Sequence, residues 1–212
     1  MLKAIVTSGA TKEKIDPVRY ITNNSSGKQG HAIAYALAKQ GVKVTLVSGS
    51  VNIPTPDNVR LKNIESADDM LKAVEDSLPA DIFISTAAVC DWKPEILHTQ
   101  KMKKNSNDDY LDIRFVKTPD ILKTISNHDL RPTIVVGFAA ETENLIENAK
   151  IKLEKKGCDY IVANNVSNGV FGEDSNQISL ISKSCVNNWD KMSKIDIATK
   201  LVDIILSNFQ QS

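Results

Sequence analysis

Side chains that bind anions and polarise carbonyl groups are concentrated in residues 16–30, whose sequence is Asp-Pro-Val-Arg-Tyr-Ile-Thr-Asn-Asn-Ser-Ser-Gly-Lys-Gln-Gly. An apolar run precedes this stretch and helical apolar spacing follows it, which predicts a loop between a strand and a helix. Ser25 and Ser26 are favourable N-cap residues, and Gly27 allows a ligand to approach the backbone closely. The start of a helix attracts anions through its unpaired N–H groups and its dipole. We therefore expect a phosphate or carboxylate site here, flanked by arginine and asparagine donors.

The elements that position this stretch alternate along the chain. Apolar runs and alternating patterns predict strands at 2–6, 42–48, 59–64, 81–88, 110–116, 133–139, 159–163 and 177–182. Cap residues and helical spacing predict helices at 31–40, 66–77, 141–156 and 193–209, and another that begins at Thr118. Short strand–helix–strand connections imply parallel strands. The predicted fold class is α/β, a Rossmann-like three-layer fold with a mostly parallel sheet and a small C-terminal β/α extension.

One domain is expected to span residues 1–212, because no low-complexity linker or internal repeat divides the chain. Residues 89–109 interrupt the alternation, since they are polar, charged and rich in Asn and Asp. We expect this segment to be an exposed, flexible flap. The small residues at the end of strand 81–88 lie where open α/β sheets bind their ligands.

Composition excludes several classes of function. Lys+Arg and Asp+Glu both number 26, so no net field favours nucleic acid or an acidic membrane surface. No apolar run reaches the length of a membrane span, and no signal peptide is expected, so we predict a cytoplasmic protein. The three cysteines form no Cys-x-x-Cys and the three histidines are scattered, which argues against a disulfide framework and a zinc site.

A nicotinamide-dependent oxidoreductase is the first alternative that this topology suggests. The first strand is not followed by Gly-x-Gly-x-x-Gly, and the second ends in Ser-Gly-Ser at residues 48–50 instead of a ribose-binding acid. Tyr35 and Lys39 have the Tyr-x-x-x-Lys spacing of short-chain dehydrogenases but occur too early in the chain. The Gly-x-x-x-x-Gly-Lys-Ser/Thr spacing of a Walker A loop is also absent around Lys28. A non-enzymatic nucleotide-binding module on the same fold is the other alternative.

Six motifs occur in a definite order along the chain. They are the stretch from Asp16 to Lys28, Ala87-Ala-Val-Cys-Asp-Trp, Lys101-Met-Lys-Lys, Thr118-Pro-Asp-Ile-Leu, Val136-Gly-Phe-Ala-Ala-Glu-Thr and Ala163-Asn-Asn-Val-Ser. Together they resemble phosphopantothenate–cysteine ligase, also called phosphopantothenoylcysteine synthetase, over nearly the whole chain. Many bacterial members are fused behind a flavin-dependent decarboxylase, which this sequence lacks, so we expect the stand-alone form with the decarboxylase as a separate chain.

The resemblance implies a ligation of 4'-phosphopantothenate and L-cysteine to 4'-phosphopantothenoyl-cysteine in coenzyme A biosynthesis. CTP would activate the carboxylate as an acyl-cytidylate with release of pyrophosphate, and the cysteine amine would then displace the nucleotide. It also implies Mg²⁺, for which the motifs identify no protein ligand, and a homodimer with the substrate site near the interface.

The same resemblance implies roles for individual residues. Asn23 matches the family asparagine that holds the activated acyl group, and Lys101 matches a flap lysine that closes over the triphosphate; these are the two expected catalytic residues. The expected nucleotide-binding residues are Ser25, Ala87, Asp91, Lys101, Pro119, Asp120, Ile121, Leu122, Phe138, Lys152 and Lys156. The expected phosphopantothenate-binding residues are Arg19, Asn23, Ser26, Gly27 and Ala88. The sequence departs from the family at Cys90, where Ala is frequent, and at Asn165, where Asp is common.

Overall fold

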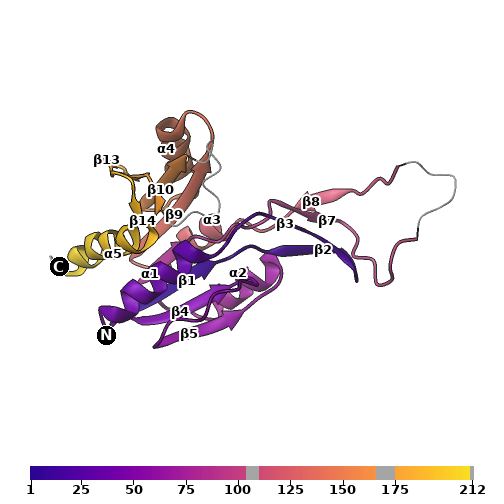
Figure 1. Cartoon of the computed structure of the whole chain (residues 1–212), viewed down its shortest axis with the longest axis horizontal. Helices are drawn as coiled ribbons and strands as arrows, with labels where there is room; N and C mark the ends of the chain where they lie inside the picture. The colour runs from indigo at the N-terminus through magenta and orange to yellow at the C-terminus, as the bar shows by residue number, and fades with distance from the viewer. Residues whose placement is uncertain (104–109, 166–174, 211–212) are drawn as a thin grey trace.

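A central sheet organises the protein in a computed structural model, which describes residues 1–103, 110–165 and 175–210 (Figure 1). Within these residues the sheet has eight strands. Their spatial order is β13 (Val186–Asn188), β12 (Ile178–Ser182), β10 (Tyr160–Asn165), β9 (Ile134–Glu141), β6 (Ile82–Ser85), β1 (Lys3–Ser8), β4 (Lys43–Ser48) and β5 (Val59–Asn63). The six strands from β10 to β5 pair in parallel. At the other edge, β12 runs antiparallel to β10, and β13 runs antiparallel to β12. The predicted Rossmann-like fold is confirmed.

Helices cover both faces of the sheet, which makes three layers. On one face lie α1 (Lys28–Lys39) and α5 (Lys194–Gln210), packed against each other. On the other lie α2 (Ala67–Glu75), α3 (Ile121–Ser126) and α4 (Leu145–Lys156). The inner strands are apolar on both faces because helices cover them on both sides, as in Ile82, Phe83 and Ile84 of β6, which are fully buried. No helix in the described ranges is both long and apolar enough to cross a bilayer.

The observed helix starts show which of the predicted N-caps are correct. The capping box predicted at Ser66 is present, because the Ser66 hydroxyl accepts from the Asp69 amide and the Asp69 carboxylate accepts from the Ser66 amide. The prediction that Ser25 or Ser26 is the N-cap of α1 is wrong, since the N-cap is Gly27, although Ser26 Oγ accepts from the Lys28 amide at 3.5 Å. The helix starts predicted at Thr118 and at residue 141 are also wrong, because both lie before the observed starts. The observed N-caps are Asp120 for α3 and Asn144 for α4.

A β-structured arm extends from the body of the molecule (Figure 1). It consists of two antiparallel ribbons, β2 (Lys12–Asp16) with β3 (Arg19–Thr22), and β7 (Trp92–Pro94) with β8 (Phe115–Lys117). The described residues 95–103 and 110–114, which lie in the connection from β7 to β8, also belong to the arm. The predictions of a loop over 16–30, an irregular flap from residue 89 and a strand at 110–116 are therefore wrong in part. Residues 104–109 of the predicted flap lie outside the described residues. A third short ribbon pairs β11 (Ser175–Asn176) with β14 (Met192–Ser193).

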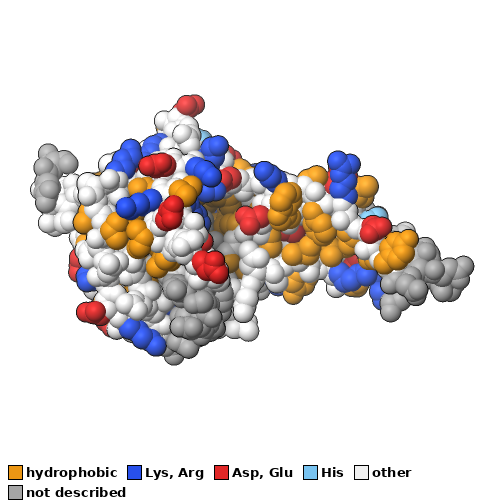
Figure 2. Space-filling model, turned by 90° about the horizontal axis from the view of Figure 1, so that it is seen from above, with side chains coloured by type: hydrophobic (Ala, Val, Ile, Leu, Met, Phe, Trp, Pro, Cys, Tyr) orange, Lys and Arg blue, Asp and Glu red, His pale blue; other side chains and the backbone are white. Residues whose placement is uncertain are grey.

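Many of the exposed apolar side chains lie on the arm. Figure 2 shows hydrophobic side chains gathered along it. The exposed large apolar residues of the arm are Val18, Tyr20, Trp92, Ile96, Leu97, Tyr110 and Leu111. A contiguous apolar surface of this kind marks an interaction site in a folded protein.

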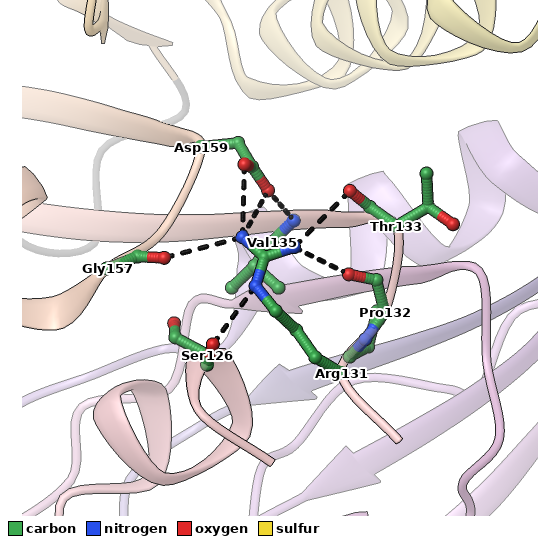
Figure 3. A network of polar contacts seen from close by, with 7 residues as sticks. All are labelled: Ser126, Arg131, Pro132, Thr133, Val135, Gly157 and Asp159. Carbon is green, nitrogen blue, oxygen red and sulfur yellow. Dashed lines mark hydrogen bonds and ion pairs between the residues drawn. The ribbon is translucent and has the colours of Figure 1, made fainter. Parts of the chain in front are cut away.

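An arginine network ties together the amino-terminal ends of β9 and β10, opposite the edge of the sheet where ligands bind (Figure 3). The Arg131 guanidinium donates to both carboxylate oxygens of Asp159, at 3.0 and 2.9 Å, and to the Ser126 carbonyl at 3.0 Å. Asp159 also accepts from the Val135 amide at 2.7 Å. The network links the carboxyl end of α3 to two strands, so it stabilises the fold without contacting the site.

Replacing Arg131 by Met should lower the free energy of unfolding by about 1–2 kcal/mol, because several acceptors lose a charged donor. The effect is moderate because the Arg131 and Asp159 side chains are 31% and 36% exposed. Urea unfolding measures it. Arg114→Met is the matched control, since its pair with Glu95 is 3.5 Å long and its side chain is 79% exposed. Equal stability losses in the two variants would contradict the assigned role of the network.

Candidate active site

Two adjoining cavities open at the carboxyl edge of the parallel strands. Cavity A, of about 470 Å³, lies between the loop after β6, the start of α3 and the last turns of α4. Cavity B, of about 580 Å³, lies between the start of α1, the loop after β6 and the C-terminal extension. This is the edge at which open α/β sheets bind ligands. Cavity A is lined by Ala87, Asp91, Pro119, Asp120, Ile121, Leu122, Phe138, Lys152 and Lys156 among others. Cavity B is lined by Asn23, Ser25, Ser26, Gly27 and Ala88 among others.

The cavities share one wall. Five residues line both: Ala87, Val89, Asp91, Phe138 and Lys152. A ligand in cavity A and a ligand in cavity B can therefore bring reactive groups together at this wall, which suits group transfer between two bound molecules.

The start of α1 presents backbone to cavity B. Gly27 has a φ of +73°, and a Cβ at this position would lie 2.7 Å from Val51 Cγ1. A Cβ at Gly30 would lie 2.6 Å from both Ser8 Cβ and Thr86 Oγ1. Only glycine fits both positions, so the helix start packs directly on the ends of β1 and β6 and keeps its amides at the cavity. The predicted anion site thus has the geometry of a helix amino terminus with Gly27 as the N-cap, where Ser25 and Ser26 accept long hydrogen bonds from the Gly27 and Lys28 amides at 3.4 and 3.5 Å.

Asn23 lies at the mouth of cavity B, beside the shared wall. Its Nδ2 donates to the Val89 carbonyl oxygen at 3.0 Å. Because Val89 lines both cavities, this bond places a neutral amide donor next to the junction.

Lys152 and Lys156 lie one turn apart on α4 and bring positive charge to cavity A, which Lys117 also lines. Lys152 Nζ donates to the Phe138 carbonyl oxygen at 2.9 Å. Burial, with the charge of Lys156 as a second cause, lowers the pKa of Lys152. Lys156 forms an ion pair with Asp120, which also caps α3 through the Lys123 amide. Two ammonium groups held on one face can neutralise a polyanionic ligand.

Arg19 and Lys101 are the predicted site residues that the structure does not bring to the cavities. Among the described residues that line cavities A and B, neither is present. Arg19 pairs with the buried carboxylate of Asp16 and donates to the Met102 carbonyl oxygen at 3.2 Å. The hydrogen-bonded Arg19 guanidinium holds the pKa of Asp16 well below its usual range. Lys101 is exposed and precedes Met102, so both residues belong to the arm.

Sequence reasoning missed part of cavity B. The additional polar residues that line it are Asn24, Lys28, Gln29, Thr86, Asn164, Asn176 and Lys194. Lys28 and Asn164 stand inside quoted motifs, which was a signal for them. Asn176 and Lys194 come from the C-terminal extension, and nothing in their local sequence points to the site. Gln29 Nε2 donates to the Lys194 carbonyl oxygen at 3.1 Å and so joins α1 to α5 at the cavity.

The two departures from the family pattern are resolved differently. Cys90 is buried and its amide donates to Thr11 Oγ1 at 3.0 Å. Burial raises the pKa of the Cys90 thiol, which makes it a packing residue and not a nucleophile. The side chain of Asn165 lies outside the described part of the chain.

A divalent cation has few protein ligands here. Across the described ranges, no group of three or more His, Cys, Asp and Glu side chains could hold a metal ion. The carboxylates among the described lining residues are Asp91 and Asp120, and Asp120 is already paired with Lys156. The donor set fits Mg²⁺ bound mainly through ligand phosphates, the usual mode for that ion.

Comparison with known proteins identifies the family. Residues 1–209 match the DNA/pantothenate metabolism flavoprotein C-terminal domain. The chain is 43% identical to the coenzyme A biosynthesis bifunctional protein CoaBC of Haemophilus influenzae over 213 residues, or 100% of this chain and 53% of that protein. It is 45% identical to CoaBC of Escherichia coli K12 over 184 residues, or 84% of this chain and 45% of that protein. The chain thus spans about half the length of the curated relatives it matches.

Solved structures agree with this match. The crystal structure of the C-terminal domain of CoaBC has a TM-score of 0.84 and 35% identity, and the alignment covers 100% of this chain and 97% of that chain. A Streptococcus pneumoniae protein described as the DNA/pantothenate metabolism flavoprotein has a TM-score of 0.82 at 24% identity, covering 98% and 100% of the two chains, which shows the shared fold alone. The chain therefore belongs to the family of the DNA/pantothenate metabolism flavoprotein C-terminal domain.

Proposed function

We propose that this protein is a phosphopantothenate–cysteine ligase, which joins 4'-phosphopantothenate to L-cysteine in coenzyme A biosynthesis. The observation that carries the proposal is the pair of cavities with one shared wall, which gives an activated acid and a nucleotide separate places that meet at a junction. Family membership and relatives named for coenzyme A biosynthesis support it. The motifs in the two cavities are those that resemble the ligase.

The reaction proposed at the junction has two steps. In the first, a carboxylate oxygen of 4'-phosphopantothenate attacks the α-phosphorus of CTP, and pyrophosphate leaves with its electron pair. In the second, the cysteine amine attacks the acyl carbon, loses a proton to solvent, and displaces CMP. Mg²⁺ bound to the triphosphate oxygens would neutralise charge on the leaving pyrophosphate. We place CTP in cavity A and 4'-phosphopantothenate in cavity B.

The residues of cavity A suit a triphosphate. Lys152 keeps two N–H groups beyond its bond to Phe138, and Lys156 can exchange Asp120 for a phosphate oxygen. Backbone groups near Ala87 and Phe138 are proposed to read the cytosine, because paired donors and acceptors reject a base of different shape strongly.

Asn23 is the proposed electrophilic residue of cavity B. Its amide can leave the Val89 carbonyl and donate to the acyl oxygen, on which negative charge develops during attack by the amine. A neutral donor suits both steps, because it does not hold the carboxylate as tightly as a cation would. The start of α1 is proposed to bind an anionic group of the same substrate.

The arm supports a homodimer with the site near the interface. Its exposed apolar side chains need a cover, and a two-fold partner supplies one in a self-complementary contact. Such a partner can also deliver Arg19 and Lys101, which lie on the arm away from the cavities of their own chain. A cytoplasmic location and a decarboxylase on a separate chain stay predictions.

The ligase assay separates this function from its alternatives. Incubation with 4'-phosphopantothenate, cysteine, Mg²⁺ and CTP should release pyrophosphate and give the amide product, and ATP should be a much poorer substrate by kcat/KM. Asn23→Ala should lower the rate about 10²–10³-fold, as loss of an oxyanion donor does. Absence of pyrophosphate with every nucleoside triphosphate would refute the ligase, and comparable kcat/KM for ATP and CTP would refute the choice of base.

Replacing Lys152 by Met should leave stability unchanged or higher, because a half-buried amine with a lowered pKa is removed. Affinity for CTP should fall about 10–100-fold, as expected when a charged hydrogen bond is lost. The wild-type affinity should weaken as pH rises through the lowered pKa of Lys152, since only the protonated amine attracts phosphate. Calorimetric titration with CTP measures the affinity and its pH dependence, and urea unfolding measures the stability. Lys155→Met, at an exposed position of the same helix, should change neither, and a variant at Lys152 with normal affinity would exclude it from the site.

Assembly is tested on the arm itself. The double variant Ile96→Asp and Leu97→Asp should convert the dimer to a monomer, because it places charge on apolar side chains that are 65% and 58% exposed. Leu130→Asp is the control, since Leu130 is 50% exposed but lies outside the arm. Light scattering gives the mass of each. A wild-type monomer at assay concentration, or a dimer that survives the double variant, would contradict the proposed interface.

A further inference from the structure

A buried histidine lies in the first turn of α1, and it lines a cavity other than cavities A and B. His31 is 4% exposed and its Nδ1 lies 3.1 Å from the Gly27 carbonyl oxygen and 3.1 Å from Ser8 Oγ. Ser8 Oγ donates to the same carbonyl at 2.9 Å. The His31 backbone amide makes a further bond to it at 3.1 Å. One carbonyl oxygen thus collects the hydrogen bonds of two buried side chains and a helix amide.

These contacts favour one tautomer of the imidazole. A carbonyl oxygen only accepts, so the contact between Nδ1 and Gly27 is a hydrogen bond only when Nδ1 carries the proton. The Ser8 hydroxyl then donates to Gly27, and the Nδ1–H is shared between the Gly27 carbonyl and Ser8 Oγ. With the opposite tautomer, Nδ1 and the Gly27 oxygen would face each other with lone pairs at 3.1 Å.

The other ring nitrogen faces neutral surroundings. Among the described residues no hydrogen-bond partner is found for His31 Nε2, and the His31 side chain lines a cavity of about 300 Å³. The remaining described lining residues are Ser48, Gly49, Ser50, Val51, Ile53, Leu61, Asn63 and Ile64, none of which carries a charge. Burial lowers the pKa of His31 and so favours the neutral ring. The imidazole therefore acts as a fixed donor and not as a charge.

The Gly27 carbonyl and the Lys28 amide belong to one planar peptide unit, so they point in opposite directions. Holding the carbonyl toward Ser8 and His31 turns the amide the other way, toward Ser26, whose Oγ accepts from it at 3.5 Å and which lines cavity B. Gly27, the N-cap, adopts a φ of +73° and has no side chain of its own to cap the helix. The peptide plane between Gly27 and Lys28 is therefore held by the long Lys28–Ser26 bond on one side and by the contacts to Ser8 and His31 on the other.

We propose that His31 is a positioning residue, which fixes the Gly27 carbonyl through Nδ1–H and thereby aims the first amide of α1 at the anionic group of the substrate in cavity B. This proposal rests on the proposed function, which identifies the substrate as 4'-phosphopantothenate. The sequence pattern did not single out His31, because a histidine on the buried side of a helix is ordinarily a packing residue.

Two variants separate positioning from packing. His31→Asn retains an N–H donor at the δ position, whereas His31→Phe retains a ring but no donor. His31→Phe should raise the KM for 4'-phosphopantothenate about tenfold, the usual effect of one lost hydrogen bond, and leave the KM for CTP unchanged. His31→Asn should stay within about twofold of the wild type. Equal losses in both variants, an unchanged KM in His31→Phe, or a parallel rise in the KM for CTP would each overturn the proposal.

A second readout does not need ligase activity. In ¹⁵N spectra of the wild-type protein near neutral pH, the His31 ring should show a protonated Nδ1 and an unprotonated Nε2. Inorganic phosphate should shift the Lys28 amide resonance in wild type and His31→Asn and bind at least several-fold more weakly to His31→Phe. If the wild type makes no ligase product but these results hold, the proposed function fails and His31 keeps its role. A ring protonated at Nε2 would exclude that role whatever the activity.

Discussion

The parallel pairing of β1 with β4 and β6 is the constraint on which the site depends. Because the strands are parallel and in register, Ser8 lies beside Ser48, and Thr7 beside Ser85, so all their carboxyl ends meet at one edge. The loops that leave this edge carry Asn23, the start of α1 and the shared wall of the cavities. A strand reversed in this region would carry its loop to the opposite edge, where the Arg131 network lies.

Close packing at the same edge then determines how near the helices come. A Cβ at Gly137 would lie 2.5 Å from Leu122 Cδ2 and 2.7 Å from Ile161 Cδ1, so glycine lets α3 pack directly on β9. This contact carries the start of α3 to cavity A. On the other face, Gly30 gives α1 the same close approach to β1 and β6. The core therefore fixes the distance between the two cavities, while the arm contributes little buried apolar surface and is free to serve an interface.

The sequence predicted the parts of the fold that depend on periodic burial. The inner strands and α5, with the Ser193–Asp196 pair at its start, follow directly from apolar spacing and cap residues. The ribbons of the arm were missed because β2, β3, β7 and β8 have three to five residues each and little burial to impose a pattern. The start of α1 was mispredicted because serine propensity competed with a left-handed glycine held by tertiary hydrogen bonds to Ser8 and His31.

For the site, the motifs found residues from several elements and missed those that the C-terminal extension supplies. Lys152 and Phe138 belong to different elements, yet each stands in the family pattern and both reach the shared wall. Lys194 and Asn176 reach cavity B only because the C-terminal extension folds back over α1. His31 has no local signature at all, since its importance comes from a carbonyl four residues earlier.

The central claim is that a carboxylate in cavity B attacks a nucleotide in cavity A at the shared wall before cysteine takes part. Exchange of labelled pyrophosphate into CTP, measured without cysteine, tests it most directly. The account predicts exchange that requires 4'-phosphopantothenate and is abolished when it is omitted. Exchange that is absent with both substrates present, or that proceeds without 4'-phosphopantothenate, would contradict it.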